Sequence, residues 1–402
     1  MEHDFSTRVD RRGQGSSKWE SMLADNPTPP EGVVPLSVAD MELKNPPEIK
    51  RALHTLIDTT VLGYTEPTKR FFDACVGWQE SRHAWHPSTE WIVTSPGVVP
   101  AFFNAVRCLT RKGDGIIIQP PVYYPFKMAV EENGRTLVEN PLRLAGGHYE
   151  IDFDDLEAKA ANPANKMLIL CSPHNPVGRV WSADELRRLV DICVSNDIFI
   201  VSDEIHDDLV MPHHEHTTIM RVMRPDEYGH VLVCTAPSKT FNLAGCQASV
   251  IYVPDEQVRT RFSEGFSRLA MFDLNAFGYA ATIAAYEECA SWLDELIEVI
   301  ETNYEHLRDW AAARHPELFV FPLEGTYLAW VDFRAWGLHA KDLEAFMRKD
   351  ALLWLDEGYV FGEAGTGFER FNLACPTSVI DEALERLEEA ASRRGLGTRA
   401  GE

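Results

Sequence analysis

The sequence contains no run of about 18 apolar residues, and its first 19 residues lack the apolar core of a secretory signal. Basic residues are also scarce: 38 Lys and Arg stand against 62 Asp and Glu, which gives a net charge of −24. Such a surface repels nucleic-acid phosphates and anionic lipid heads. We therefore expect a cytoplasmic protein that binds small molecules or other subunits, and neither nucleic acid nor a membrane.

Paired cysteine motifs are absent as well. Eight cysteines are scattered through apolar stretches without any CxxC pair, so we expect small core side chains and neither a disulfide framework nor a zinc site. The stretch HDDLVMPHHEHTT invites a metal site, but it is turn-like, whereas metal ligands usually lie on regular elements. We expect no metal there. Its histidines are His206, His213, His214 and His216.

Short β-branched runs alternate with helical patterns between residues 90 and 255. The runs are EWIVTS, GIIIQ, RTLVEN, KMLILCS, IFIVSDE, HVLVCT and ASVIYV. In the intervening stretch SADELRRLVDICVSN, Ser182 is followed three residues later by Glu185, which is the pattern of a helix capping box. This alternation predicts an α/β fold with a mostly parallel seven-stranded sheet sandwiched by helices.

The pattern changes after Asp255. Long helical patterns follow, the longest over residues 276–314, and then the short strands GTYLAWVDF and FERFNLA and a last helix, VIDEALERLEEAASRR. We predict a large ligand-binding domain at residues 48–285 and a smaller α+β domain at residues 286–395, which the N-terminal segment of residues 1–47 joins.

Polar or tightly turned motifs follow several of the predicted strands, at the edge where open α/β sheets bind ligands. In TSPGVVPAFF a turn leads into a helix, whose free N–H groups at Gly97, Val98 and Val99 suit a phosphate. In CSPHNPVG, Asn175 lies between two prolines, where its amide can donate to a ligand oxygen. The simpler alternatives are amides that bind water and an asparagine that caps its own turn.

Two charged residues complete this set. The strand IFIVSDE ends at Asp203, and a buried carboxylate needs a cationic partner, although a helix cap or an ion pair with arginine would also explain it. The stretch APSKTFNLAG holds Lys239, whose amine could attack a carbonyl if burial lowers its pKa; a surface lysine is the alternative. Pyridoxal phosphate needs all four features: a Schiff-base lysine, a carboxylate at its ring nitrogen, a donor to its phenolic oxygen and an anion nest for its phosphate.

Through NPVG, SDEIH and SKTFNLAG, the chain resembles the fold-type I pyridoxal-phosphate enzymes of the aspartate aminotransferase superfamily from about residue 30 to 390. The resemblance implies that Lys239 bonds to the cofactor, Asp203 pairs with its ring nitrogen and Asn175 meets its ring oxygen. It also implies that Tyr123 of QPPVYYPF stacks on the ring, although a core tyrosine would look the same in sequence.

The resemblance extends to further ligands. Ser238 and the backbone amides of the phosphate loop would hold the cofactor phosphate, because Gln247 stands where many relatives have an arginine. Tyr64 of GYT resembles a tyrosine that reaches this phosphate from the other subunit, which implies a homodimer with shared active sites. Arg370 of GFERFNLACP resembles the arginine that forks onto a substrate carboxylate. Because His206 stands two residues after SDE, we also expect it near the cofactor ring, where it would tune Asp203, with a surface position as the alternative.

Two reactions start from the same constellation. A transaminase returns a proton to the cofactor carbon, whereas a β-lyase expels a thiol from the substrate's β-carbon and yields pyruvate and ammonia. PLSVADMELKNPPEI, RRGQGSSKW and GTYLAWVDFR resemble the cystathionine β-lyase and cysteine-S-conjugate β-lyase branch, which serves methionine and cysteine metabolism. The chain departs from this branch at Ser37, Glu42 and Leu43, where Trp, Asp and Phe are common.

The branch places Asp40 and Met41 at the mouth of the substrate pocket, with plain docking of the N-terminal segment as the alternative. Asn175 and Tyr64 are expected beside the substrate together with Arg370. We therefore expect a pyridoxal-phosphate-dependent carbon–sulfur β-lyase that cleaves cystathionine or related cysteine S-conjugates. An aminotransferase with the same cofactor and a catalytically inactive regulatory relative are the alternatives.

Overall fold

A computed structural model of the 402-residue chain describes residues 2–397. Its main sheet has seven strands in the order β1-β9-β8-β7-β6-β2-β3, and within it β9 is the antiparallel strand. The strands are β1 (Ile92–Ser95), β2 (Gly115–Ile118), β3 (Thr136–Glu139), β6 (Asn165–Cys171), β7 (Phe199–Asp203), β8 (Val231–Thr235) and β9 (Ser249–Tyr252). Each of the seven expected runs forms one of them, so the predicted α/β sheet is confirmed.

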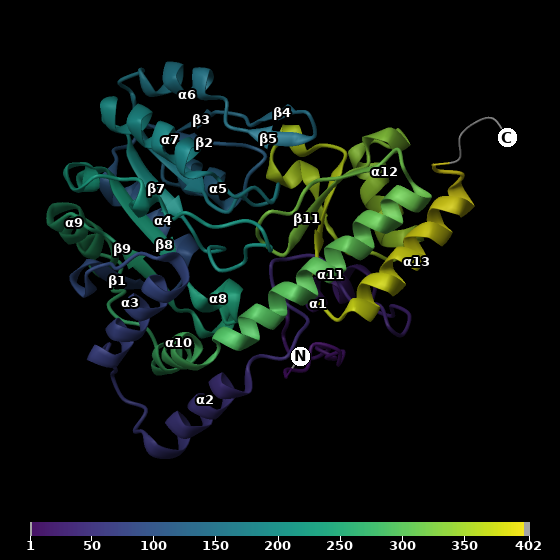
Figure 1. The fold of residues 1–402 in the computed structure, drawn as a ribbon, viewed down its shortest axis with the longest axis horizontal. Helices are drawn as coiled ribbons and strands as arrows, with labels where there is room; N and C mark the ends of the chain where they lie inside the picture. The colour runs from purple at the N-terminus through teal and green to yellow at the C-terminus, as the bar shows by residue number, and fades with distance from the viewer. Residues whose placement is uncertain (1, 398–402) are drawn as a thin grey trace.

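Helices cover both faces of this sheet (Figure 1). Neighbouring residues of a strand point to opposite faces, so Met167 and Ile169 of β6 contribute to one core and Leu168 and Leu170 to the other. The first core is covered by α4 (Val98–Leu109), α5 (Pro125–Glu132) and α9 (Glu256–Ser267). The second is covered by α3 (Lys69–His83), α6 (Phe153–Ala160), α7 (Ala183–Ser195) and α10 (Ala276–Glu288).

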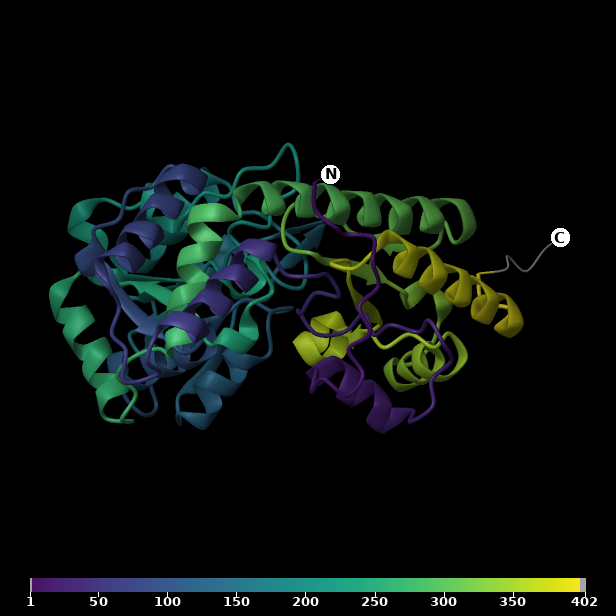
Figure 2. The ribbon, with the colours of Figure 1, turned by 90° about the horizontal axis from the view of Figure 1, so that it is seen from below.

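Local signals explain some helix ends and not others. The capping box of α7 is confirmed, because the Ser182 hydroxyl accepts from the Glu185 N–H while the Glu185 carboxylate accepts from the Ser182 N–H. The single helix expected over residues 276–314 is wrong, since α10 ends before Cys289 and α11 (Ala290–Arg314) follows. The first half packs on α2 (Pro47–Thr59) and α3, whereas α11 crosses to the smaller unit (Figure 2), and one straight helix cannot do both.

The smaller unit is built on a four-stranded antiparallel sheet in the order β10-β11-β13-β12. Its strands are β10 (Phe319–Val320), β11 (Leu328–Asp332), β12 (Asp356–Glu357) and β13 (Phe368–Asn372), and its helices include α12 (Ala340–Ala345) and α13 (Thr377–Arg394). The N-terminal segment with α1 (Ser17–Asp25) lies alongside (Figure 2). The Leu36 carbonyl accepts from the Asn372 N–H, which ties this segment to β13. The domain boundaries themselves stay a prediction.

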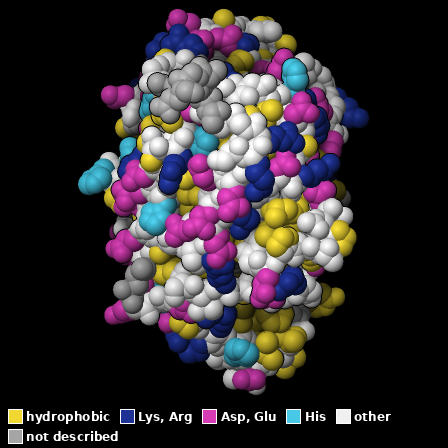
Figure 3. Space-filling model, turned by 90° about the vertical axis from the view of Figure 1, so that its right-hand side faces the viewer, with side chains coloured by type: hydrophobic (Ala, Val, Ile, Leu, Met, Phe, Trp, Pro, Cys, Tyr) yellow, Lys and Arg dark blue, Asp and Glu magenta, His cyan; other side chains and the backbone are white. Residues whose placement is uncertain are grey.

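Other features follow the composition. All eight cysteines are unpaired, and six of them are buried, as expected for core side chains. Figure 3 shows acidic and basic side chains interleaved on the end of the molecule that carries α12 and α13. A hairpin of β4 (Arg143–Ala145) and β5 (His148–Glu150) was not predicted. Across residues 2–397 no helix combines the length and the apolar character needed to cross a bilayer.

Candidate active site

Three neighbouring parallel strands bring polar residues to one edge of the main sheet. Cys171 at the end of β6 pairs with Asp203 at the end of β7, and Asp203 pairs with Cys234 of β8. Asn175 and Lys239 follow the ends of β6 and β8, so they reach the same edge. Cys171, Asn175, Asp203 and Lys239 line one cavity, which encloses about 710 Å³ when the solvent at its mouth is included. Among the other predicted residues, its wall includes Gly97, Val98, Val99, Tyr123, His206 and Ser238.

Lys239 lies in the one-turn helix α8 (Pro237–Thr240), directly after β8. Its Nζ donates a hydrogen bond of 2.7 Å to the carbonyl oxygen of Ala39. Burial lowers the pKa of Lys239 to about 8, and the guanidinium of Arg370 acts in the same direction, against three nearby carboxylates. Part of the amine is therefore uncharged near neutral pH, as a nucleophile toward a carbonyl must be.

Asp203 is buried with few partners of its own. Its Oδ1 accepts one hydrogen bond, from the Ile205 N–H at 3.2 Å. Burial raises the pKa of Asp203 to about 7, while that hydrogen bond and the charge of Lys239 act in the opposite direction. A buried carboxylate with so little compensation suits a ligand that brings a positive charge or an N–H donor. A protonated pyridine nitrogen has both properties.

Arg370 of β13 is buried beside the cavity and held by three groups. Its Nη1 donates to Oδ1 of Asn175 at 2.8 Å, while Nη2 and Nε donate to Oδ2 of Asp356 at 2.5 and 3.2 Å. The ring of Phe361 lies 4.7 Å from the guanidinium carbon. A guanidinium has five N–H donors, so one donor on each of Nη1 and Nη2 is left, which is the pair that a carboxylate takes. Asn175 likewise keeps its amide N–H groups for a ligand.

Tyr123 and His206 contribute rings to the cavity wall. Burial raises the pKa of Tyr123, so its hydroxyl stays neutral. Burial lowers the pKa of His206 well below its usual value, and the charges of Lys239 and Arg370 add to this effect. Nδ1 of His206 is buried and has no hydrogen-bond partner among the described residues. This buried atom at the cavity wall is therefore free to bond to a ligand or a water molecule.

The first turn of α4 closes one side of the cavity. Gly97 is the N-cap of this helix and lines the cavity with Val98 and Val99, so the free N–H groups of the turn lie at the wall. Gln247 is there too, with φ of +51°. The sequence prediction missed Ser249, whose hydroxyl is buried in the wall without a partner in the described part of the chain. Its signal is topological: β9 is antiparallel, so its first residue lies where the parallel strands end.

Besides Arg370, which lies beside the cavity, three predicted residues lie outside the cavity wall. The Asp40 carboxylate binds Arg11 at 2.6 and 3.1 Å, and Met41 is 1 % exposed in the main core; Ala39 is the residue of this segment that lines the cavity. Tyr64 is fully exposed on another surface. Substrate contacts for these three therefore stay predictions.

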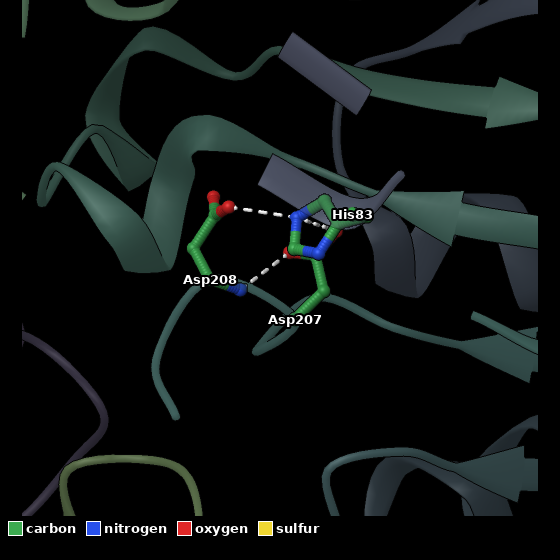
Figure 4. Close-up of side chains that lie close together, drawn as sticks. All are labelled: His83, Asp207 and Asp208. Carbon is green, nitrogen blue, oxygen red and sulfur yellow. Dashed lines mark hydrogen bonds and ion pairs between the residues drawn. The ribbon is translucent and has the colours of Figure 1, made fainter. Parts of the chain in front are cut away.

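A second cluster of ionisable groups lies behind the cavity. Figure 4 shows His83 of α3 between Asp207 and Asp208, and the described residues contain no other group of three or more with metal-ligand geometry. His83 Nε2 lies 2.9 Å from Asp208 Oδ1. Trp78 also donates to Oδ1 and Thr240 to Oδ2 of Asp208, and the Asp208 N–H and the Gln79 side chain donate to the two oxygens of Asp207. Donors of the protein itself therefore already bind the carboxylate oxygens of this cluster.

The four loop histidines do not converge on one point. His216 is buried and pairs with Glu204 at 3.0 Å, whereas His213 and His214 are exposed and His206 lines the cavity. Each has a different neighbourhood, so the loop offers no shared ligand position.

Comparison with known proteins gives a consistent result. The model of the family "Aminotransferase class I and II" matches residues 31–387. A cystathionine beta-lyase of Bacillus subtilis, PatB, is 40% identical over 97% of this chain and its own full length. The crystal structure of cystalysin from Treponema denticola, which contains pyridoxal 5'-phosphate, has a TM-score of 0.96 and 46% identity over 98% of this chain and all of that one.

A solved structure of a carbon–sulfur lyase from Staphylococcus hominis, also bound to pyridoxal phosphate, has a TM-score of 0.88 and 30% identity, and it covers 96% of this chain and 98% of its own. The family model and these relatives extend over nearly the whole chain, including both sheets and the residues that line the cavity. The chain therefore belongs to the aminotransferase class I and II family.

Proposed function

We propose that this chain is a pyridoxal-phosphate-dependent carbon–sulfur β-lyase that cleaves cystathionine or related cysteine S-conjugates. The observation that carries the proposal is the full-length likeness to a cystathionine beta-lyase, 40% identical, in a chain whose cavity gathers Lys239, Asp203 and Asn175. A catalytically inactive regulatory relative would have no chemical need for this set.

The cavity fits the cofactor chemically. Asp203 offers a buried carboxylate to a ring nitrogen, Asn175 offers amide N–H groups to a ring oxygen, and the ring of Tyr123 offers a flat face. The N–H groups at the start of α4, with Ser238, suit the phosphate. His206 and Ser249 bring buried polar atoms that lack partners in the described chain, so a polar ligand would satisfy them.

When bound, pyridoxal phosphate withdraws electrons from the α-carbon of an amino acid joined to it. Lys239 would hold this group through its amine, and the same Nζ, once free, would accept the α-proton of the substrate. Arg370 binds the α-carboxylate with its two remaining donors. The β-carbon–sulfur bond then breaks, the thiol leaves with the electron pair and a proton, and aminoacrylate hydrolyses to pyruvate and ammonia.

We further propose that the chain acts as a homodimer with shared active sites. Large apolar side chains lie exposed on one surface, with Val61 90% exposed, Leu62 60% and Phe272 70%. Leu62 and Phe272 line a groove between residues 62–66 and 270–277, and Tyr64 lies in this groove too. An apolar patch of this kind favours burial against a second copy, which would bring Tyr64 to the neighbour's cavity. A cytoplasmic location stays a prediction from the sequence.

The reaction is tested by incubating the purified chain with cystathionine and with S-alkyl cysteines, without any keto-acid acceptor. A lyase releases pyruvate and a free thiol in equal amounts. The alternative function, an aminotransferase with the same cofactor, gives turnover only when a keto acid is added, and that result would reject the lyase. Borohydride reduction followed by peptide mapping should place the pyridoxyl label on Lys239.

Shared sites are tested by mixing two inactive variants. In a mixed dimer of Lys239→Ala and Tyr64→Ala chains, one site combines the intact lysine with the intact tyrosine, so activity should return on mixing. Light scattering should give twice the mass of the 45.4 kDa chain. A monomer, or mixtures that stay inactive although dimers form, would contradict the shared site.

A further inference from the structure

Val38 adopts a backbone conformation that β-branched residues rarely take. Its φ is +56°, in the left-handed region where the Cβ of an L-residue is crowded. Such a residue persists only where its surroundings hold it, and these positions cluster at functional sites. The next residue is Ala39, whose carbonyl accepts the hydrogen bond from Nζ of Lys239. The strained residue is therefore one peptide away from the contact made by the lysine amine.

Two side chains of the smaller sheet hold Val38. Oδ2 of Asp356 accepts from the Val38 N–H at 2.8 Å, and Nδ2 of Asn372 donates to the Val38 carbonyl at 2.7 Å. The same Nδ2 donates to the carbonyl of Asp40 at 2.7 Å. Both polar groups of the Val38 backbone are thus bound by side chains, so the direction of the Ala39 carbonyl depends on β12 and β13.

The same oxygen of Asp356 also holds Arg370. Asp356 and Arg370 face each other in register across β12 and β13, and Oδ2 accepts from Nη2 and Nε as well as from Val38. Arg370 is 4% exposed, so Asp356 supplies its neutralising charge in a place with little water. One carboxylate oxygen therefore joins the arginine fork to the turn at Val38.

We propose that Asp356 is a positioning residue that fixes the fork of Arg370 and the carbonyl of Ala39 relative to each other, and so places the amine of Lys239. The inference rests on the proposed function. The α-carbon that loses its proton carries the carboxylate that Arg370 binds, so the distance from the fork to the amine decides whether the amine meets that proton. Small errors in such a placement reduce rates strongly.

The charge of Asp356 also acts on Lys239. The groups that face the amine are Arg370 of β13, Asp356 of β12, Asp40 of the N-terminal segment, Asp203 of β7 and the buried His206. The carboxylate of Asp356 is among those that raise the pKa of Lys239, against burial and Arg370. Removing its charge should therefore lower the pH at which the amine becomes reactive.

The test uses the full chain freed of cofactor, and follows the rate at which added pyridoxal phosphate condenses with Lys239 as a function of pH. In Asp356→Asn the midpoint of this profile should move down by roughly half a unit to one unit. In Asp356→Glu, which keeps the charge but shifts it by one methylene, the midpoint should stay while kcat/KM for cystathionine falls about tenfold to a hundredfold. Asp342→Asn, at an exposed position of α12, is the matched control and should change neither.

Two failures can be told apart. If Lys239 of the parent chain is never labelled, the proposed function is wrong whatever Asp356 does. If the parent is labelled but Asp356→Asn only lowers the unfolding temperature and leaves the pH profile unchanged, the positioning role is overturned. Should Asp356→Asn fail to fold, Asp356→Glu decides, because a kcat/KM equal to that of the parent would equally overturn the role.

Discussion

The stretch after β7 supplies two regions with opposite properties. Asp203 and His206 face the cavity, where Asp203 accepts one hydrogen bond and Nδ1 of His206 has no partner in the described chain. Asp207 and Asp208 lie close to His83 instead (Figure 4). Each of their carboxylate oxygens already has a hydrogen-bond partner. Buried polar groups normally have hydrogen-bond partners. The cavity groups that lack partners can therefore bind a ligand, whereas the cluster of His83, Asp207 and Asp208, which we call the supporting cluster, stabilises the fold around the cavity.

The pKa values of Asp203 in the cavity and Asp208 in the cluster are shifted in opposite directions. Burial raises the pKa of Asp203 to about 7 because little compensates it. Burial also acts to raise the pKa of Asp208, but the hydrogen bond and charge of His83 outweigh it, and the pKa is lowered. Burial lowers the pKa of His83, yet the carboxylates of Asp207 and Asp208 raise it to about 9. Burial and the charge of Asp208 raise the pKa of Asp207 well above its usual value, so His83 is the counterion of Asp208. Asp203 has no such hydrogen-bonded cation among the described residues, although the charge of Lys239 acts on it.

The largest effect is expected from removing the amine. Lys239→Ala should reduce β-elimination by about a thousandfold or more, because the residue is both nucleophile and base. The chain should fold normally, since burying a lysine opposes stability rather than adding to it. Steady-state kinetics and the pyridoxyl label measure the change, with the exposed Lys69→Ala as the control. Activity within tenfold of the parent would remove Lys239 from the mechanism.

The raised pKa of Asp203 should make the stability of the chain depend on pH. The pKa of Asp203 is raised from 3.8 to about 7 in the folded chain, so its contribution is full below pH 4 and is lost as the pH rises through 7. At pH 8 the cofactor-free chain should therefore be less stable by on the order of 4 kcal/mol than it would be with a neutral group there.

Asp203→Asn should abolish this pH dependence and raise the unfolding temperature of the cofactor-free chain at pH 8, while activity falls about a hundredfold. Thermal unfolding from pH 4 to 8 measures the first effect, and the exposed Asp197→Asn is the control. Equal pH dependence in the variant and the parent would mean that Asp203 is compensated after all.

Removing an acid from the supporting cluster should lower stability and leave activity nearly unchanged, which is the opposite of the effect expected at Asp203. Asp208→Asn leaves His83, Trp78 and Thr240 without their shared carboxylate, so we expect a loss of about 3 kcal/mol in the free energy of unfolding at pH 7. The kcat should change by less than about tenfold, because no group at the cavity is removed. Denaturant unfolding checks this, with the exposed Asp226→Asn as the control. A stable but inactive variant would place the cluster in the chemistry.

Sequence reasoning reached the groups that follow strands directly. Asn175, Asp203 and Lys239 come just after apolar runs, and strand ends meet at one edge by the geometry of a parallel sheet. Ser249 needed one further step, because only the antiparallel direction of β9 brings a strand's first residue there. The break at Cys289 has no sequence signal, since Cys and Ala are both tolerated in helices and the turn follows from packing on two units.

The contacts that were missed join distant parts of the chain. His83 meets Asp208 across 125 positions and Val38 meets Asp356 across 318, and no local pattern marks either pair. The contact between Lys239 and Ala39 uses a backbone carbonyl, which every residue has. For the same reason the sequence drew attention to the side chains of Asp40 and Met41, whereas the cavity is lined by their neighbour.

The smallest expected effect lies at the boundary between the two regions. The Thr240 hydroxyl donates to Oδ2 of Asp208 at 2.7 Å, and Thr240 follows Lys239 in α8. Thr240→Val should lower the free energy of unfolding by about 1 to 2 kcal/mol, because a buried acceptor loses its best donor, and Thr240→Ser should restore most of it. If α8 holds the lysine independently of the cluster, kcat changes only a few-fold in both variants. A large fall in kcat in Thr240→Val at unchanged stability, with kcat restored in Thr240→Ser, would contradict this. It would show that the cluster positions the amine of Lys239, and Thr240 would then belong to the active site and not to the supporting cluster.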